Sequence, residues 1–293
     1  MSIKYKAYLM LSTAVLFWSG NLIVARGLNE SISAVALASG RWWLATLILM
    51  PFTWRAMKRD WPVIRQNWLI ITLLGLTGVS LFNTLLYQAA HTTTSTNIAL
   101  IQTTMPAMIV LIMALFMAEK HSWRAWLGVI VSVAGATLVV SRGDWQVLQS
   151  MSFVSGDLWM LLANLVYGIY SILLKKKPAI SSLSLLGSSF IAGSLLLVPV
   201  FAWDIGINPL PQMTSHLAGS LLYVAIFPSI ASYLAWNRGV SLIGPSLAGF
   251  FICLMPVFTG ILATVFLQEG FYWYHVTGLL FIFAGFVLFQ QKK

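Results

Sequence analysis

Charged residues are scarce in this chain, and their scarcity limits the class of protein. They make up 8% of the 293 residues, against 59% hydrophobic residues, and the mean hydropathy is +0.86. Soluble domains usually carry about 25% charged residues. A water-soluble fold could not hide this much apolar side chain, because more than half of a typical folded surface is already apolar. The composition therefore predicts an integral membrane protein with the lipid bilayer as its solvent.

Cysteine and the sequence signatures of enzymes are almost absent. Cys253 is the one cysteine and lies in an apolar run, which excludes a disulfide framework and a thiolate metal site. The four histidines, His91, His121, His216 and His275, fall near the ends of predicted helices in different loops, a spread that does not suit a metal site. G-x-S-x-G, H-E-x-x-H and phosphate-loop motifs are missing as well. We therefore expect no enzymatic activity and no cofactor.

Acidic residues are few, seven against 17 Lys and Arg, and the formal net charge is +10. Such a charge can indicate nucleic-acid binding, but those proteins present a basic face on a soluble fold. Here the basic residues lie in short gaps between apolar runs, as cytoplasmic loops of membrane proteins do. We expect a small-molecule substrate and the lipid bilayer as partners, and no nucleic acid. The oligomeric state cannot be inferred.

A cleavable signal is also missing. The amino terminus, MSIKYKAYLM, continues into a long hydrophobic run without the short apolar core and A-x-A-like site of a secretory signal. The run predicts a retained first membrane helix.

Long apolar runs are what the sequence has in abundance. A helix needs about 20 mainly apolar residues to cross roughly 30 Å of hydrocarbon. Ten segments meet this requirement: 7–27, 33–53, 68–89, 95–118, 124–141, 156–174, 181–202, 216–236, 244–267 and 274–291.

The positions of the basic residues support this set of helices. With the amino terminus inside, Arg26 and Arg142 fall outside, Arg41 lies within a span, and the other 14 of the 17 Lys and Arg are cytoplasmic. Cytoplasmic loops of membrane proteins carry such an excess. We therefore predict a multi-pass protein of a bacterial cytoplasmic (inner) membrane with both termini in the cytoplasm.

The two halves of the chain repeat each other, which is a feature to establish before any motif. At a constant offset of 150 residues, Met105-Pro106 recurs as Met255-Pro256, Glu119 as Glu269, Trp123 as Trp273, and Gly128 and Gly135 as Gly278 and Gly285. Earlier segments align with small shifts, and the helix breaker Gly78 pairs with Pro228. These matches predict two repeats, residues 1–143 and 150–293, of five helices each.

An odd number of crossings places the second repeat upside down relative to the first. The predicted fold is thus an all-α integral membrane protein of ten transmembrane helices, arranged as two inverted five-helix repeats around a central cavity. Inverted repeats recur in transporters, with the substrate site near the midplane between the copies. Gene duplication is nevertheless common in membrane proteins and by itself proves no activity.

Several short stretches carry a family resemblance. In the first half they are F-W-S-G-N at 17–21, S-G-R-W-W at 39–43, Tyr87 with Ala89-Ala90, Met-Pro at 105–106 and Ala-Glu-Lys at 118–120. In the second half they are Trp236-Asn237, Met255-Pro256 and Gln268-Glu269-Gly270. With these stretches, nearly the whole chain resembles the drug/metabolite transporter superfamily, of the EamA-like, ten-helix type.

The resemblance implies a basket of helices around a central cavity, alternating access and, frequently, export of amino acids or related metabolites. One departure concerns Arg41. The second half has Ser188-Ser189 near the corresponding place, so any role of this arginine is not duplicated.

Arg41 is the sharpest single feature of the sequence. It lies about eight residues into its predicted helix, roughly 12 Å deep at 1.5 Å per residue. A charge at that depth costs several kcal/mol unless it is paired or hydrated. Arg41 is a candidate anchor for a substrate carboxylate or phosphate. Alternatively, it extends to the surface or caps carbonyl groups that hold two helices together.

Polar and aromatic residues within the predicted spans are the other candidates for the cavity wall, because buried polar groups need partners. Trp18 and Asn21 are three residues apart and share a helix face, as do Tyr167 and Tyr170. The remaining candidates are Asn83, Tyr87, Asn97, Gln102, Tyr233 and Trp236. For each of them, a role in holding helices together competes with substrate contact.

Pro106 and Pro256 are candidate hinges. A proline inside a helix removes one hydrogen bond and clashes with the preceding turn. The alternative is a static kink that only shapes packing. Elsewhere, the spacing of Gly128, Ser132 and Gly135 predicts a smooth face for close helix packing.

We therefore predict a secondary transporter that exports amino acids or related small metabolites by alternating access. The alternatives are a hydrophobic drug efflux carrier and a non-transporting membrane receptor or assembly protein. No acidic residue lies deep in a span, so the sequence does not indicate a coupling ion.

Overall fold

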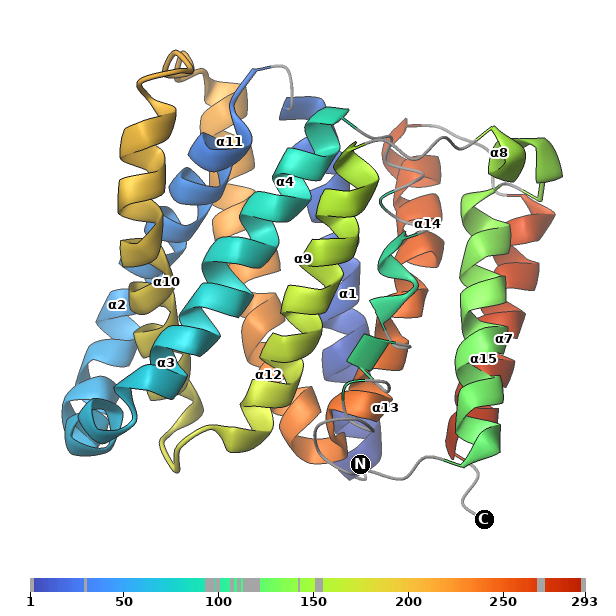
Figure 1. Ribbon diagram of the computed structural model, residues 1–293, viewed down its shortest axis with the longest axis horizontal. Coiled ribbons are helices and arrows are strands. Elements are labelled where there is room, and N and C mark those ends of the chain that lie inside the picture. Colours follow the sequence, from blue (N-terminus) through green and yellow to red (C-terminus); the bar gives the residue numbers. More distant parts are fainter. Residues whose placement is uncertain are drawn as a thin grey trace.

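The computed structural model describes residues 3–28, 31–92, 98, 101–105, 108–109, 112, 122–141, 143–150, 155–267 and 272–290. Across these residues the secondary structure is helical, with no strand. Figure 1 shows the helices standing side by side, with α1 (Ile3–Leu28) beginning and α15 (Trp273–Gln290) ending at the same end of the molecule. The all-helical class predicted from the long apolar runs is confirmed.

Among the described residues, seven helical segments are long and apolar enough to cross a membrane. They are Ile3–Ala25, Ala34–Gln66, Trp68–Thr92, Ser155–Lys176, Ser182–Asp204, Ser215–Ile243 and Pro245–Leu262. Two shorter apolar helices, Trp123–Leu138 and Trp273–Phe289, occupy two more of the predicted spans. The span predicted at 95–118 lies for the most part outside the described residues, so the count of ten helices stays a prediction.

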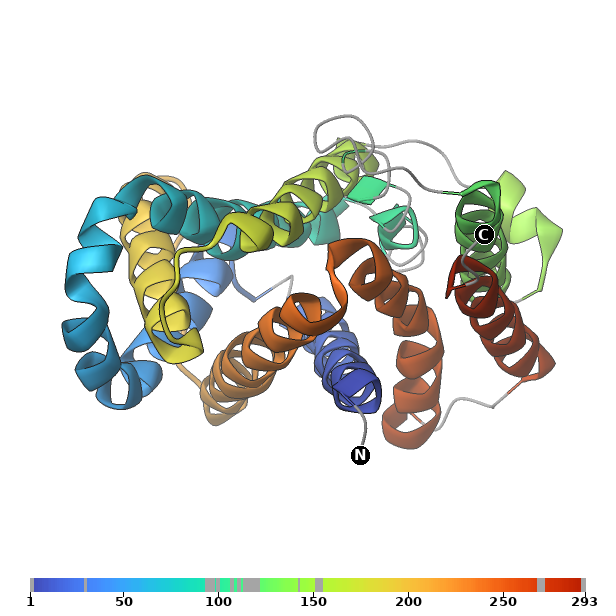
Figure 2. The same ribbon diagram turned by 90° about the horizontal axis from the view of Figure 1, so that it is seen from below.

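Two pairs of helices lie at opposite ends of the bundle. Figures 1 and 2 show α2 (Ala34–Gln66) beside α10 (Ser182–Asp204) at one end, and α7 (Trp123–Val140) beside α15 at the other. Between them lie α1, α4 (Phe82–Thr92), α9 (Ser155–Leu173), α12 (Ser232–Ile243) and α14 (Met255–Leu267). The smaller elements are α3 (Trp68–Gly75), α8 (Trp145–Gln149), α11 (Ser215–Val224), α13 (Pro245–Gly249) and the 3-10 segments η2 (Leu174–Lys176) and η4 (Phe250–Leu254).

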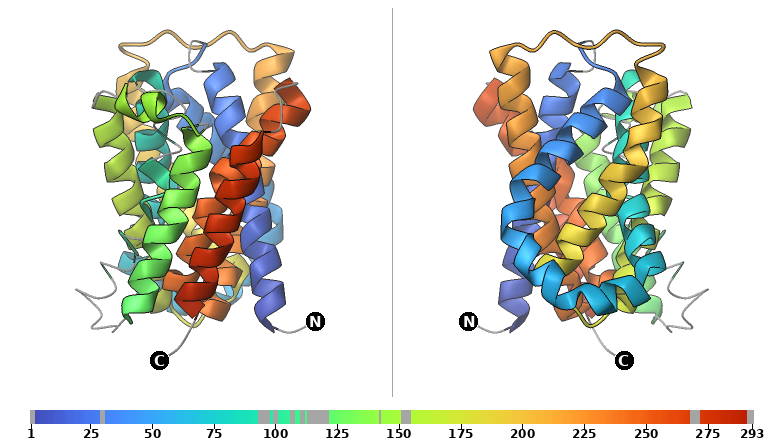
Figure 3. Two further views of the ribbon diagram at one scale, coloured as in Figure 1. Left: turned by 90° about the vertical axis from the view of Figure 1, so that its right-hand side faces the viewer. Right: turned by 90° about the vertical axis from the view of Figure 1, so that its left-hand side faces the viewer.

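Helix α2 is longer than the sequence predicts. The expected span ended at residue 53, whereas the helix continues through Pro51 and Pro62 to Gln66. Its 33 residues would measure about 50 Å, well beyond the roughly 30 Å of a bilayer core. The extension buries Met57 and Ile64 on one face and exposes charged residues on the other. A search for apolar runs detects only the membrane-crossing part of such a helix and misses its amphipathic extension. The lower end of α2 curves along the base of the bundle (Figure 3).

The third and eighth predicted spans each contain a π-helical segment. These are η1 (Leu76–Leu81), between α3 and α4, and η3 (Ala225–Ala231), between α11 and α12. Gly78 lies in η1 and Pro228 in η3, the two positions that the repeat aligns as helix breakers. A π-turn displaces hydrogen bonds from the regular i to i−4 pattern and often marks a functional site. Both helices therefore have an irregular turn near their middle.

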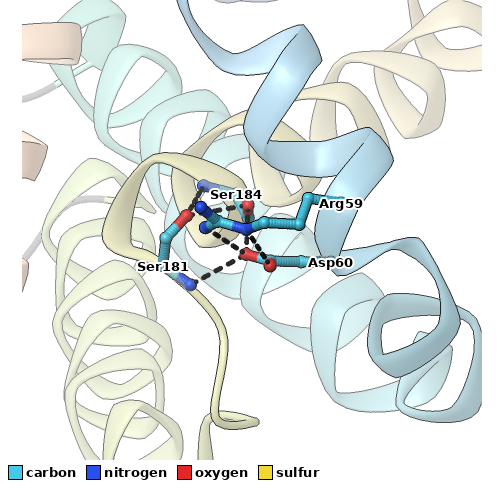
Figure 4. A network of polar contacts seen from close by, with 4 residues as sticks. All are labelled: Arg59, Asp60, Ser181 and Ser184. Carbon is cyan, nitrogen blue, oxygen red and sulfur yellow. Dashed lines mark hydrogen bonds and ion pairs between the residues drawn. The ribbon is translucent and has the colours of Figure 1, made fainter.

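Carboxylates join α2 to α10 at both ends of the pair. The Asp60 Oδ2 atom accepts hydrogen bonds from the Ser181 backbone N–H (3.0 Å) and the Ser184 hydroxyl (2.6 Å) at the start of α10, while Oδ1 pairs with Arg59 (Figure 4). At the other end, Ser33, the N-cap of α2, donates to Asp204 Oδ2 (2.5 Å). Negative charge is favourable at helix N-termini. The start of each helix thus meets the end of the other, so α2 and α10 are antiparallel.

Glycines bring α7 and α15 into backbone contact. A Cβ atom added at Gly128 would lie 2.5 Å from the Gly285 carbonyl oxygen, and one at Gly135 would lie 2.7 Å from that of Gly278. Ser132, between them, donates to the Ile282 carbonyl (3.4 Å). These two helices are antiparallel as well, and the small-residue face predicted from the spacing is the one that packs.

Gly135→Ala should destabilise the protein, because its methyl group would meet the backbone of α15. Overpacking of this kind costs about 1–3 kcal/mol. The matched control is Gly219→Ala in α11, where an added Cβ meets nothing within 4 Å and alanine favours the helix. We expect a lower melting temperature of the detergent-purified protein for Gly135→Ala and an equal or higher one for the control. Equal melting temperatures for both variants would contradict the close packing.

Candidate functional site

A pocket lies in the middle of the bundle, between the two helix pairs. Its wall comes from α1, α2, α4, α9, α12, η4, α14 and the described residues near 102–105. The lining residues are Trp18, Asn21, Leu22, Arg41, Phe82, Asn83, Leu86, Gln102, Met105, Tyr167, Tyr233, Ile252 and Met255. The sequence named seven of these as cavity candidates: Trp18, Asn21, Arg41, Asn83, Gln102, Tyr167 and Tyr233.

Arg41 is the most constrained residue of the pocket wall. Its side chain is 1% exposed, so it does not extend to the surface. Nε donates to Ser229 Oγ (2.6 Å), and Nη1 donates to Asn83 Oδ1 (2.8 Å), to the Tyr87 hydroxyl (2.8 Å) and, at 3.5 Å, to Asn21 Oδ1. The guanidinium also lies over the Trp42 ring, 4.8 Å from its centroid. Arg41 therefore joins α2 to α4 and η3 through side chains rather than carbonyl groups.

The positive charge of Arg41 has no acidic partner among the described residues. The one ion pair in that part of the chain joins Arg59 to Asp60. Neutral oxygens surround the guanidinium instead, and the Tyr87 hydroxyl that accepts from Nη1 donates in turn to Asn21 Oδ1 (3.1 Å). Within the same residues, Nη2 makes no hydrogen bond. Because buried charges are normally paired, the pocket retains an unmet capacity for an anion.

Aromatic rings form a second wall of the pocket. Trp18 packs edge to face on Tyr167 (5.6 Å between centroids) and on Tyr233 (6.0 Å). Phe82 contacts Tyr167 from α4, at 4.6 Å. Edge-to-face and offset rings of this kind are favourable and rigid. The pocket therefore places one cationic group opposite a preformed apolar surface.

Two polar groups in the pocket wall have no hydrogen-bond partner within the described structure. They are Gln102 Oε1 and the Tyr167 hydroxyl, and both are buried. Buried polar atoms are almost always bonded, so each is available to a bound molecule. The amide oxygen accepts a hydrogen bond, whereas the phenol can donate or accept.

Three other predicted residues do not line the pocket but contact residues that do. Tyr87 bonds both Arg41 and Asn21, and Trp236 packs on Trp18 with 5.1 Å between ring centroids. Tyr170 packs on Tyr167 (5.2 Å) and donates to Asn237 Oδ1 (2.6 Å).

Asn97 and the candidate hinge Pro106 lie outside the described residues. The second candidate hinge, Pro256, is the second residue of α14 and directly follows the turns of η4. A 3-10 segment inside a longer helical run often marks a hinge. The hinge role of both prolines stays a proposal.

Ser229 is the functional candidate that sequence reasoning missed. It is fully buried in η3 and accepts the Arg41 Nε hydrogen bond. A serine in an apolar run is usually interpreted as a small packing residue. The available signal was its position directly after Pro228, since a proline in a span frees backbone groups that polar side chains then bond.

The centre of this helical membrane bundle combines aromatic side chains with a buried cation, which are the kinds of group that bind small amphipathic molecules. Comparison with known sequences identifies the family of the protein. The profile of the EamA-like transporter family matches the chain twice, at residues 5–141 and 154–290. The chain belongs to this family. It is a multi-pass membrane transporter of a small-molecule substrate and not an enzyme, and the receptor or assembly-protein alternative is not supported.

Related proteins agree with this assignment. An "Uncharacterized transporter" of Archaeoglobus fulgidus is 28% identical over 291 residues, 98% of each chain. A protein of Streptantibioticus cattleyicolor named "Probable terminal-alkyne amino-acid exporter" is 25% identical over 73% of this chain and 68% of its own. A protein of known crystal structure superimposes with a TM-score of 0.78 over 97% of this chain and 96% of its own, at 17% identity. That last likeness supports the fold.

Tyr87→Phe should lower the melting temperature, because it removes an acceptor for the buried Arg41 and a donor to Asn21. Hydrogen bonds to charged groups contribute about 1.5–3 kcal/mol. Tyr223→Phe is the matched control, since no hydrogen bond of that hydroxyl is found among the described residues. Thermal unfolding in detergent measures both, and a Tyr87→Phe protein as stable as the control would contradict the Arg41 network.

Proposed function

We propose that the protein exports amino acids or closely related small carboxylates by alternating access. In this proposal the pocket between the two matched halves is the substrate site and Arg41 binds the substrate carboxylate. The observation that carries the proposal is the buried Arg41 guanidinium, which has no acidic partner among the described residues and retains an unbonded nitrogen on the pocket wall. A carboxylate would supply the missing charge, and Arg binds carboxylates in a two-point geometry.

The rest of the pocket fits the remainder of an amino acid. Gln102 Oε1 is an unbonded acceptor for an amino group, and the Tyr167 hydroxyl is a second unbonded group. Trp18, Tyr167 and Phe82 offer an apolar surface to a side chain. The name of the Streptantibioticus cattleyicolor relative, an amino-acid exporter, points to the same substrate class.

The proposed mechanism uses two inverted halves. The double family match supports two copies. The antiparallel pairing of α2 with α10, and of α7 with α15, supports inversion, since each pair contains the helices that the repeat aligns. Rocking one half against the other would expose the pocket first to the cytoplasm and then outside.

Efflux of hydrophobic drugs is the second candidate function, and the aromatic wall is the observation that favours it. In that case the substrate would bind mainly by ring contacts, and Arg41 would serve only to join helices. The two functions differ in their need for the arginine charge.

Arg41→Gln should reduce transport of a carboxylate substrate by more than tenfold, because the buried charge that receives it is lost. Metabolite profiling of the medium from overproducing cells, compared with empty-vector cells, would identify the exported compound. Uptake of that compound into inside-out vesicles would then measure the variant. Arg65→Gln is the matched control, because Arg65 is exposed on the same helix. A folded Arg41→Gln protein with unchanged transport would overturn the carboxylate role and favour drug efflux.

The proposed orientation places both termini in the cytoplasm of a bacterial inner membrane. A green fluorescent protein fused after Lys293 should therefore fluoresce, and alkaline phosphatase fused there should be inactive. Alkaline phosphatase inserted after Gln149, in the loop that contains α8, should be active, because that loop is predicted to lie outside. The reverse pattern of activities would contradict the orientation.

A further inference from the structure

The two π-helical segments and Arg41 belong to one hydrogen-bonded network. Ser229, in η3, accepts from Arg41 Nε and donates to the Val224 carbonyl, five residues earlier (2.7 Å). Asn83, just after η1, accepts from Arg41 Nη1 and donates to the Val79 and Gly78 carbonyls (3.1 and 3.3 Å). A single side chain therefore separates the guanidinium from the Gly78 and Val79 carbonyls of η1, and from the carbonyl of Val224, the residue directly before η3.

Each π-segment is also held from the other family-matched half of the chain. Trp18, in the first half, donates through Nε1 to the Pro228 carbonyl of η3 (2.8 Å). Tyr233, in the second half, donates through its hydroxyl to the Gly78 carbonyl of η1. Both aromatic residues line the pocket. A movement of either π-segment would therefore change the pocket wall.

The geometry of a guanidinium limits how a carboxylate can join this network. Two-point binding uses adjacent nitrogens, either Nε with Nη2 or Nη1 with Nη2. Nη2 is unbonded within the described structure and takes part in both modes, so the second nitrogen decides between them. The Nη1 edge is occupied by Asn83, Tyr87 and, at 3.5 Å, Asn21, whereas the Nε edge is occupied by Ser229 alone. Displacing one neutral hydroxyl is the smaller change.

We infer that Ser229 is a positioning residue that couples substrate binding to movement of η3. The inference rests on the proposed function, because it requires a carboxylate at Arg41. The carboxylate takes the Nε and Nη2 donors, and the Ser229 hydroxyl leaves Arg41. Segment η3 is then released from α2, while Asn83 and Tyr87 keep α4 attached to the guanidinium. Substrate binding thus loosens one matched half and not the other.

The test compares Ser229→Ala with Ser232→Ala in the full-length protein. Ser232 is equally buried and bonds the Phe227 and Ala14 carbonyls, with no hydrogen bond to Arg41. The probes are L-phenylalanine and phenethylamine, which differ by the carboxylate. Because Ser229 competes for Nε, its removal should tighten binding of L-phenylalanine about tenfold and leave phenethylamine binding unchanged. Ser232→Ala should change neither; a purely structural Ser229 would give equal effects on both probes.

Hydrogen–deuterium exchange provides the second readout. In the wild-type protein, L-phenylalanine should speed amide exchange in 225–231 and leave 76–81 unchanged, while phenethylamine should do neither. In the ligand-free protein, Ser229→Ala and Arg41→Gln should each speed exchange in 225–231, and the double variant should add nothing further. Binding of L-phenylalanine with no change in 225–231 would overturn this inference while leaving the proposed function standing. No binding of L-phenylalanine by a folded protein would count against the proposed function itself.

Discussion

A guanidinium ion surrounded by neutral oxygens holds the centre of this protein together. Arg41 reaches Asn83 and Tyr87 on α4 and Ser229 on η3, and all of these side chains are buried. An unpaired charge at this depth is costly, and its neutral acceptors, which include Asn21 at 3.5 Å, recover only part of the hydration that it loses. The helices around Arg41 are therefore joined by hydrogen bonds to a charge that is only partly compensated. In the proposed function, the same deficit makes the site receptive to an anion.

The two ends of the bundle are symmetric in chemistry, while its centre is not. At one end, Asp60 bonds the start of α10, and Asp204 bonds the start of α2. At the other, Gly128 contacts Gly285 while Gly135 contacts Gly278, a reciprocal pattern typical of two-fold interfaces. Arg41 has no such counterpart, since Ser188 and Ser189 stand near the corresponding place. In the proposed function, a symmetric frame would allow two equivalent outward and inward states, and the single arginine would give the substrate one orientation within it.

The sequence predicted the parts of the site better than their connections. Apolar run length located the spans, because the bilayer imposes it, and polar residues within them pointed to the pocket. The glycine spacing predicted the face by which α7 packs, but neither its partner α15 nor their antiparallel direction. Periodicity could not show that Asn83, Tyr87 and Ser229 converge on Arg41, because helices far apart in the chain meet only through tertiary packing. The alignment of the two repeats marked Gly78 and Pro228 as helix breakers, but it could not distinguish a kink from a π-turn. Which of the two forms depends on tertiary contacts such as the Trp18 and Tyr233 hydrogen bonds. The extension of α2 beyond its predicted span was missed, because hydropathy detects the part of a helix that crosses the membrane and not the full length of the helix. In the proposed orientation this extension lies on the cytoplasmic side.

The missing acidic partner also explains how such a pocket would select its substrate. Aromatic walls attract apolar molecules and cations alike, because a ring face carries negative potential. A cationic drug entering this pocket would approach Arg41 with no carboxylate among the described residues to offset the repulsion, in a medium of low dielectric constant where charge interactions are strong. For a carboxylate the sign of the interaction is reversed: it would be attracted by the guanidinium, and its apolar part would keep the contacts with the rings. In the proposed function, specificity against cations would therefore arise from a group that is missing among the described residues of the pocket, which is discrimination by repulsion rather than by added contacts. It would be lost if an acidic residue were placed beside Arg41, even though every ring remained in position.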